Sequence, residues 1–129
     1  MSRHIPSPFP AARPRRLRRT PWIRAAVAEA TLSPADFIWP IFLREDGAEA
    51  TVPSMPGVRR LDLGEAVDAA REAAGLGIPI IALFPLVPAE RKTPGGEEAT
   101  NPDNLVCRAT RALKKAVPEI GVLTDVALD

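Results

Sequence analysis

The residues best suited to chemistry in this sequence are two aspartates near its end. Asp125 lies inside residues 121–129 (GVLTDVALD), a run rich in Val and Leu, and Asp129 ends that run. The run predicts a short buried strand, and α/β folds hold catalytic and ligand-binding groups at the carboxyl ends of parallel strands. Both aspartates are therefore candidate site residues. The alternative for an isolated aspartate is structural: it caps the following loop or pairs with an arginine.

Other residue types that often do chemistry are scarce. Cys107 is the single cysteine and His4 the single histidine, so the chain can form neither an intramolecular disulfide nor a Cys/His cluster for zinc. Any metal bound here must therefore be a hard ion with oxygen ligands. Cys107 falls in a helical pattern, which predicts a small core or half-buried residue rather than a ligand.

The composition is that of a soluble globular protein. Of the 129 residues, 46% are hydrophobic and 26% are charged. The longest apolar runs, such as IPIIALFPLVP, are far shorter than the roughly 20 residues of a membrane span, and no apolar segment follows the arginine-rich beginning as it would in a secretory signal. We therefore expect a cytoplasmic protein with no membrane partner.

Charge is distributed unevenly along the chain. Residues 1–19 contain six arginines and no acid, although the net charge of the whole chain is only +1. The same residues are rich in proline and poor in large apolar side chains, which predicts an extended basic arm without a core of its own. Because interleaved aromatic residues are missing and the rest of the chain is acidic, nucleic acid is a poor partner. A neighbouring copy of the same chain is a better one.

Residues 20–129 alternate between helical and strand patterns. Three continuous apolar runs predict strands, at residues 37–43, 78–84 and 121–129. Pro40, in the first run, argues against a strand that is hydrogen-bonded along both edges. Because the runs are apolar throughout and do not alternate with polar residues, they predict a parallel sheet covered by helices. The expected fold class is therefore α/β.

Capping residues mark the helices between these strands. Three helix starts are predicted, at Thr20-Pro21, at Asp62 with Glu65 as its capping-box partner, and at Asn101-Pro102. Trp22 belongs to an apolar stripe in the first of these helices. We expect Trp22 and Trp39 to be packing residues, since no sugar- or base-binding set surrounds them.

Several of these segments together resemble one known family. They are RPRRLRRTPWIRAAVAEATLSPADFIWPIFL, SMPGVRRL, GIPIIALFP and NPDNLVCRATRALKKAVPEIGVLTDVALD. In this order they resemble the N-terminal part of porphobilinogen synthase, also called delta-aminolevulinic acid dehydratase, and cover nearly everything from Arg13 to Asp129. The resemblance implies an N-terminal arm plus the first three βα-type strands of a TIM (β/α)8 barrel. The barrel is incomplete in this chain, because a full one needs about 250 residues.

The resemblance also implies an activity. Family members condense two molecules of 5-aminolevulinate to porphobilinogen with loss of water, in tetrapyrrole biosynthesis, and use two lysines on late barrel strands that form Schiff bases with the substrate. Neither lysine is in this chain, because Lys92, Lys114 and Lys115 do not follow a predicted strand at the mouth of the sheet. We therefore expect a lyase fragment that is inactive alone. The alternative is a non-catalytic assembly module built from the arm and the partial barrel.

By the same resemblance, Asp125 is the candidate catalytic residue and Asp129 the candidate metal ligand. Asp125 matches a family residue near the reacting amines, where a carboxylate would orient an ammonium group or accept a proton. Zinc-dependent members have cysteines at the positions of Ala127 and Asp129. This chain therefore resembles the branch without catalytic zinc, with magnesium or a monovalent cation as the expected ion. The family's arm wraps a neighbouring subunit, which predicts a homo-octamer.

Overall fold

The chain forms two compact units, Met1–Leu32 and Ser33–Asp129. The computed structural model describes residues 8–13 and 15–125. Each unit is described by itself below, and the second holds the sheet. No helix in the described part of the chain is long and apolar enough to cross a membrane.

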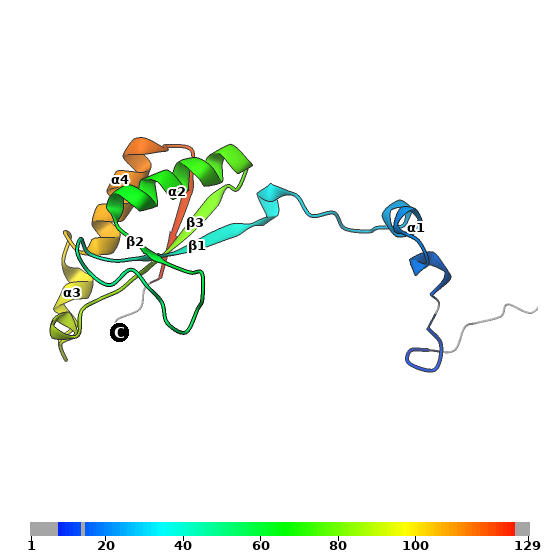
Figure 1. The fold of residues 1–129 in the computed structure, drawn as a ribbon, viewed down its shortest axis with the longest axis horizontal. Coiled ribbons are helices and arrows are strands. Elements are labelled where there is room, and N and C mark those ends of the chain that lie inside the picture. The colour runs from blue at the N-terminus through cyan, green and yellow to red at the C-terminus, as the bar shows by residue number, and fades with distance from the viewer. Residues whose placement is uncertain (1–7, 14, 126–129) are drawn as a thin grey trace, which may run out of the picture. The chain divides into compact units, whose positions relative to one another are not determined.

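The described residues of the N-terminal unit form two short helical segments and no core of their own. The unit holds a 3-10 helix, η1 (Arg16–Arg18), and a short helix, α1 (Pro21–Ala26), and neither has a buried residue (Figure 1). Thr20 caps α1 as predicted, because its Oγ1 accepts a hydrogen bond from the N–H of Ile23 at 3.4 Å. Trp22 is 71% exposed, so its prediction as a packing residue is wrong for the described chain. Although η1 contacts α1, neither element has a buried residue, and a helix of six residues is too short to bury a large side chain by itself.

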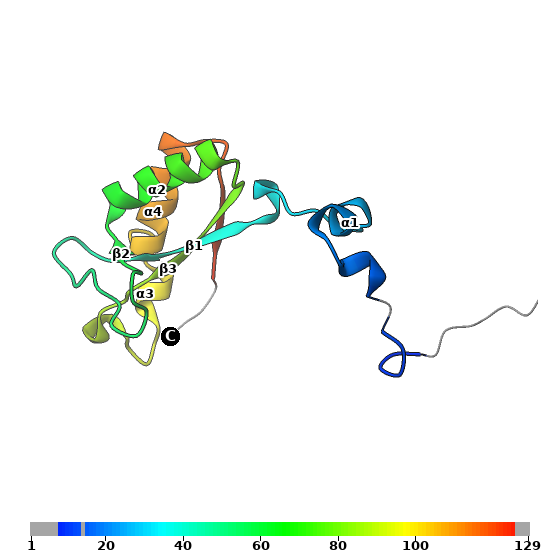
Figure 2. The ribbon, with the colours of Figure 1, turned by 45° about the vertical axis from the view of Figure 1, so that its right-hand side comes forward.

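The second unit is built on a four-stranded parallel sheet in the order β2-β1-β3-β4 (Figures 1 and 2). The strands are β1 (Ile38–Leu43), β2 (Arg60–Leu61), β3 (Ile80–Pro85) and β4 (Gly121–Thr124). The parallel arrangement confirms the sequence prediction. The number of strands does not, because three were predicted and β2 was missed. A strand of two residues is too short to show any periodic pattern.

Pro40 lies in β1, which the sequence predicted not to be hydrogen-bonded along both edges, and the strand pairing at Pro40 confirms this. It lies opposite Ala82 of β3, with β2 on the other side of β1. β2 pairs with β1 only through Phe42 and Leu43, so the described chain has no strand beside Pro40 on that edge. A proline, which lacks an N–H, is tolerated where one edge of its strand is unpaired.

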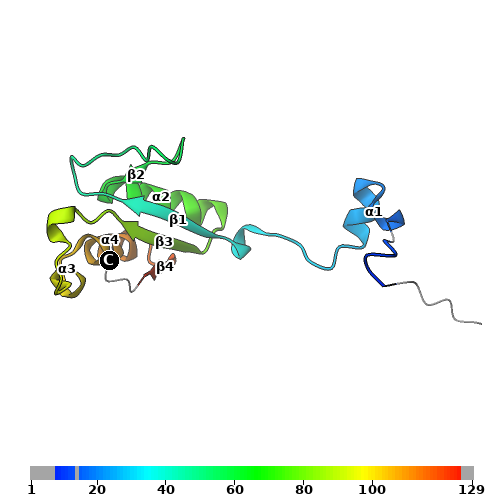
Figure 3. The same ribbon diagram turned by 90° about the horizontal axis from the view of Figure 1, so that it is seen from below.

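Two helices cover one face of the sheet. They are α2 (Leu63–Leu76) and α4 (Leu105–Ala116), which pack against each other and against β1 and β3 (Figure 3). The predicted capping box of α2 is confirmed: Asp62 Oδ1 accepts from the N–H of Glu65 at 2.9 Å, and Glu65 Oε2 accepts from the N–H of Asp62 at 3.0 Å. Gly77, at φ 80°, ends α2 in the left-handed conformation.

The start of α4 differs from the prediction. Asn104 is its N-cap, with Oδ1 accepting from the N–H of Cys107 at 2.8 Å, whereas Asn101 ends a one-turn helix, α3 (Glu97–Thr100). Both asparagines are good caps, so the sequence alone favoured the one followed by proline. The segment between β3 and α4 also holds the 3-10 helix η3 (Ala89–Arg91).

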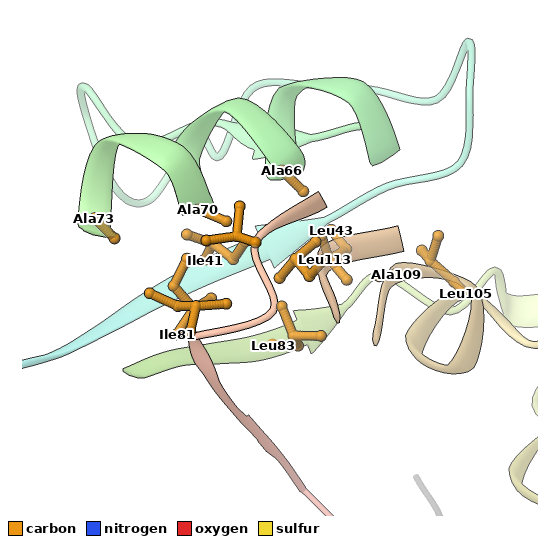
Figure 4. Packing of buried hydrophobic residues seen from close by; sticks show 12 residues of the cluster. Ile41, Leu43, Ala66, Ala70, Ala73, Ile81, Leu83, Leu105, Ala109 and Leu113 are labelled. Carbon is orange, nitrogen blue, oxygen red and sulfur yellow. The ribbon is translucent and has the colours of Figure 1, made fainter. Parts of the chain in front are cut away.

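The core lies between the sheet and these two helices. Alternate residues of β1 and β3 point into it, and small alanines on α2 let that helix approach the strands closely (Figure 4). Its labelled members are Ile41, Leu43, Ala66, Ala70, Ala73, Ile81, Leu83, Leu105, Ala109 and Leu113. Trp39 packs against this cluster, which confirms its prediction as a packing residue.

The opposite face of the sheet is apolar and open in the described chain. Phe84 is 37% exposed and Leu123 is 43% exposed, although both belong to strands. Phe42 and Phe84 pair across β1 and β3 on this face, with ring centroids 6.0 Å apart. The sequence predicted strands buried on both faces, and the apolar residues for the second face are present. Only the helix-facing side is covered by described residues.

Candidate active site at the carboxyl edge of the sheet

A cavity of about 590 Å³ lies where β3 and β4 end. It is lined by the last residues of β3, by the last residue of β4 with Asp125 after it, and by the first turn of α4. Residues of the segment between β3 and α4, which holds η3 and α3, line it as well. The carboxyl edge of a parallel sheet is where α/β folds bind their ligands, so the position fits a functional site.

Asp125 lines this cavity. It directly follows β4, which ends at Thr124, so it stands at the carboxyl end of a parallel strand, whereas the sequence predicted that it lies inside a strand over residues 121–129. Thr124 lies beside it on the same wall. A catalytic role for Asp125 stays a prediction. Asp129 and Ala127 fall outside the described residues, so the expected metal position stays a prediction too.

Lys92 also lines the cavity, which corrects an expectation from the sequence. It was placed in a polar loop away from the mouth of the sheet, but η3 folds that loop back over the carboxyl edge. Lys114, by contrast, donates from Nζ to the backbone oxygen of Ile120 at 2.8 Å and so helps to close the turn before β4. Lys115 is exposed on α4. Of the three lysines, Lys92 is therefore the one that reaches the candidate site.

A chain of four charged side chains runs along one side of the cavity. Nη2 of Arg108 donates to both oxygens of Glu45, at 2.6 and 2.7 Å. Nη1 of Arg91 lies 3.4 Å from Glu45 Oε1 and 3.3 Å from Glu98 Oε1. The Glu45 carboxylate raises the pKa of Arg108, chiefly through these hydrogen bonds. Sequence analysis missed this cluster because Glu45 and Arg108 are 63 positions apart.

A second charged cluster fixes the start of α2 against the end of β1. Nη2 of Arg44 lies 3.2 Å from both Asp62 Oδ2 and Glu65 Oε2, and Arg59 contacts the other oxygen of Glu65 at 2.9 Å. The N–H of Asp62 lowers the pKa of Glu65, because it donates to the charged carboxylate. This cluster contributes no cavity residue and is structural.

Cys107 is half-buried and lines the cavity from the first turn of α4. Its half-buried position confirms the sequence prediction. In the described part of the chain, no three His, Cys, Asp or Glu side chains lie close enough together to hold a metal ion.

Fold and site together define an α/β protein with a ligand cavity at the carboxyl edge of a parallel sheet. A family model described as delta-aminolevulinic acid dehydratase matches residues 11–129. The chain therefore belongs to the delta-aminolevulinic acid dehydratase family, which confirms the resemblance in the sequence. The match takes in the sheet, both core helices and every residue that lines the cavity.

Individual relatives agree with the family match. The chain is 51% identical over 120 residues to the delta-aminolevulinic acid dehydratase of Bradyrhizobium diazoefficiens, covering 92% of this chain and 34% of that protein. It is 46% identical over 119 residues to the chloroplastic enzyme of Physcomitrium patens, covering 92% of this chain and 28% of that protein. The chain thus spans about a third of the length of these relatives.

A solved structure shows the same fold. The crystal structure of delta-aminolevulinic acid dehydratase (porphobilinogen synthase) from Toxoplasma gondii, in complex with the reaction product porphobilinogen, matches with a TM-score of 0.80 and 41% identity. The match covers 91% of this chain and 33% of that one.

Proposed function

We propose that this chain supplies the N-terminal part of a porphobilinogen synthase, a lyase that condenses two 5-aminolevulinate molecules to porphobilinogen with loss of water. The observation that carries the proposal is the cavity at the carboxyl edge of the sheet, with Asp125 in its wall. Membership of the family, and a similar structure that binds porphobilinogen, support the same reaction. Tetrapyrrole biosynthesis is then the pathway served.

The proposed architecture is the first part of a (β/α)8 barrel. In such a barrel the helices lie outside and the strands face one another inside, so each strand is buried on both faces. The parallel sheet here has helices on one face and an apolar, open second face that includes Phe84 and Leu123. Further strands closing over that face would bury it and would complete the cavity at the same edge.

Asp125 is proposed to act on the amino group of the substrate. An ammonium group has no lone pair, so it must lose a proton before its nitrogen can attack a ketone. A carboxylate in the cavity wall can hold the ammonium by a charge-assisted hydrogen bond and accept that proton. The two lysines that would form Schiff bases are expected on strands beyond this chain, and Lys92 is not assigned that role.

A chimera tests the proposal. Residues 1–129 would replace the matching N-terminal third of the Bradyrhizobium diazoefficiens relative, and porphobilinogen formation from 5-aminolevulinate would be measured. We expect an active chimera whose kcat falls by about 100-fold or more in Asp125→Asn, in line with general acid–base contributions. Asp68→Asn is the matched control, because Asp68 is an exposed carboxylate on α2 that pairs only with Arg71 in the described chain. Full activity of the Asp125→Asn chimera would refute the assigned role.

Homo-oligomer assembly through the basic arm is the second part of the proposal. The N-terminal unit combines arginines with the exposed Trp22 and has no core, a composition that suits contact with another protein surface. Deleting residues 1–19 from the chimera should give a smaller assembly by light scattering, and high salt should have the same effect. An unchanged octamer would contradict this. If the chimera assembles but has no activity, the alternative of a non-catalytic assembly module is favoured.

The proposed ion is magnesium or a monovalent cation rather than catalytic zinc. Carboxylates such as that of Asp129 prefer hard cations, and the sequence has alanine and aspartate where zinc-dependent members have cysteines. Activity of the chimera should therefore survive a zinc-selective chelator. The proposal would be overturned if the chimera bound zinc tightly and stoichiometrically and if Asp129→Ala abolished that binding. We also propose a cytoplasmic location, although the Physcomitrium patens relative is named chloroplastic.

A further inference from the structure

The wall segment of the cavity, residues 86–104 between β3 and α4, has no hydrophobic anchor of its own. None of its residues is buried, and both η3 and α3 lack buried residues. A segment without buried apolar contacts is held by polar contacts and belongs to the less stable parts of a fold. The position of this wall therefore depends on its hydrogen bonds and ion pairs.

Most of the polar side-chain contacts within this wall segment join its own residues. Arg91 pairs with Glu98 at 3.3 Å, Thr93 donates to Glu97, and Asn101 Nδ2 donates to Glu98 Oε2 at 3.2 Å. These contacts give the segment its local shape. They do not hold it against the sheet.

The two ends of the wall segment are held by other contacts, since the N–H of Leu86 donates to the backbone oxygen of Leu43 at 2.7 Å and Arg111 donates to Asp103 and to the backbone oxygen of Pro102. Glu45 connects the middle of the segment to the rest of the fold. It follows the carboxyl end of β1 by two positions, lines the cavity and contacts Arg91 in η3 at 3.4 Å. Its two short bonds from Arg108 Nη2 fix the carboxylate against α4. Glu45 thus contacts Arg91 of the wall segment and Arg108 of α4. The two hydrogen bonds from Arg108 fix the position of the carboxylate that contacts Arg91.

We propose that Glu45 is a positioning residue, which with Arg108 holds the wall segment at the distance from Asp125 that substrate binding requires. The kinetic part of this inference rests on the proposed function. Arg108 aligns the Glu45 carboxylate, and the carboxylate holds Arg91 and η3. Because residues of the wall line the cavity together with Asp125, displacement of the wall weakens substrate binding without removing the group that exchanges the proton.

Limited proteolysis of the 129-residue chain tests the structural part. Trypsin cuts after Arg91 and Lys92 in the wall and after Lys114 in α4, and mass spectrometry separates these products. We expect Glu45→Gln, which keeps the shape but removes the charge, to raise the initial cleavage rate in the wall about fivefold or more at an unchanged Lys114 rate. Asp68→Asn is the control, because it removes an exposed ion pair with Arg71 on α2 and leaves the wall and Glu45 intact. Equal wall cleavage in Glu45→Gln and the unmodified chain would overturn the proposal.

Kinetics of the chimera test the functional part. Glu45→Gln should raise KM for 5-aminolevulinate about five- to tenfold and change kcat less than about twofold, the pattern of lost binding with intact chemistry. Asp68→Asn should leave both constants unchanged. A normal KM in Glu45→Gln despite faster wall cleavage would refute the positioning role. A chimera that is inactive without any substitution would instead contradict the proposed function, while proteolysis still decides whether Glu45 holds the wall.

Discussion

Leu83 and Phe84 are neighbours on β3 that test the two faces of the sheet separately. Leu83 is 1% exposed and points into the core beneath the helices, whereas Phe84 lies on the open face and is 37% exposed. Truncating each to alanine removes a large apolar side chain from the same strand. Any general effect of a substitution on β3 is therefore common to both variants. The difference between their losses of unfolding free energy then measures how deeply each side chain is buried.

The expected losses of unfolding free energy differ several-fold. Leu83→Ala leaves a cavity in a packed core, which costs about 3–5 kcal/mol. Phe84→Ala in the isolated chain removes a partly exposed ring and its tilted contact with Phe42, 6.0 Å away, so we expect about 1–2 kcal/mol. In the chimera the additional strands would cover Phe84, and the same substitution should then cost about 3–5 kcal/mol.

Guanidinium denaturation followed by helical circular dichroism measures both losses, with unchanged m-values as the check that the unfolding transition is the same. The reasoning predicts a rise in the cost of Phe84→Ala from the chain to the chimera, and little change for Leu83→Ala. If Phe84→Ala were as costly as Leu83→Ala in the isolated chain, the face would already be covered. If it stayed inexpensive in the chimera, no barrel interior would form there.

Three further predictions concern local contacts and activity. Asp62→Ala removes the N-cap of α2 and a partner of Arg44, so it should destabilise the chain by about 1–2 kcal/mol. Asp68→Ala removes only an exposed ion pair with Arg71 and should cost less than about 0.5 kcal/mol. Equal denaturation midpoints of the two variants would contradict this prediction. The pKa of Glu65 is lower in the folded than in the unfolded chain, so its contribution is full above its ordinary value of 4.5 and is lost as the pH falls through the lower folded value. In Glu65→Gln the free energy of unfolding should therefore fall less steeply as the pH is lowered below 4.5. An equally steep fall in the variant and the unmodified chain would contradict this role of Glu65. The chain by itself should form no porphobilinogen from 5-aminolevulinate, and borohydride should trap no adduct on Lys92, Lys114 or Lys115; a trapped adduct on Lys92, the lysine in the cavity, would reopen its role as nucleophile.

The sequence predicted those features that depend on neighbours along the chain. The capping box at Asp62 and Glu65 and the cap at Thr20 involve residues three positions apart, so their spacing can be read directly. The same holds for the apolar runs that contain β1, β3 and β4, although the predicted third strand included Asp125 and β4 ends at Thr124. The start of α4 could not be predicted in this way, because Asn101 and Asn104 are both suitable N-caps. In the structure Asn104 caps α4, and Asn101 follows the unpredicted helix α3.

Only the tertiary structure decided which distant residues meet. The pairing of Glu45 with Arg108 spans 63 positions, and the approach of Lys92 to the cavity depends on how η3 folds back over the sheet. The sequence also left open which face of the strands is covered, because both faces carry apolar side chains. Register and helix placement resolve that choice: they bury Leu83 and leave Phe84 exposed. Contacts of this kind are set by the parallel pairing of strands far apart in the chain, and no local pattern encodes that pairing.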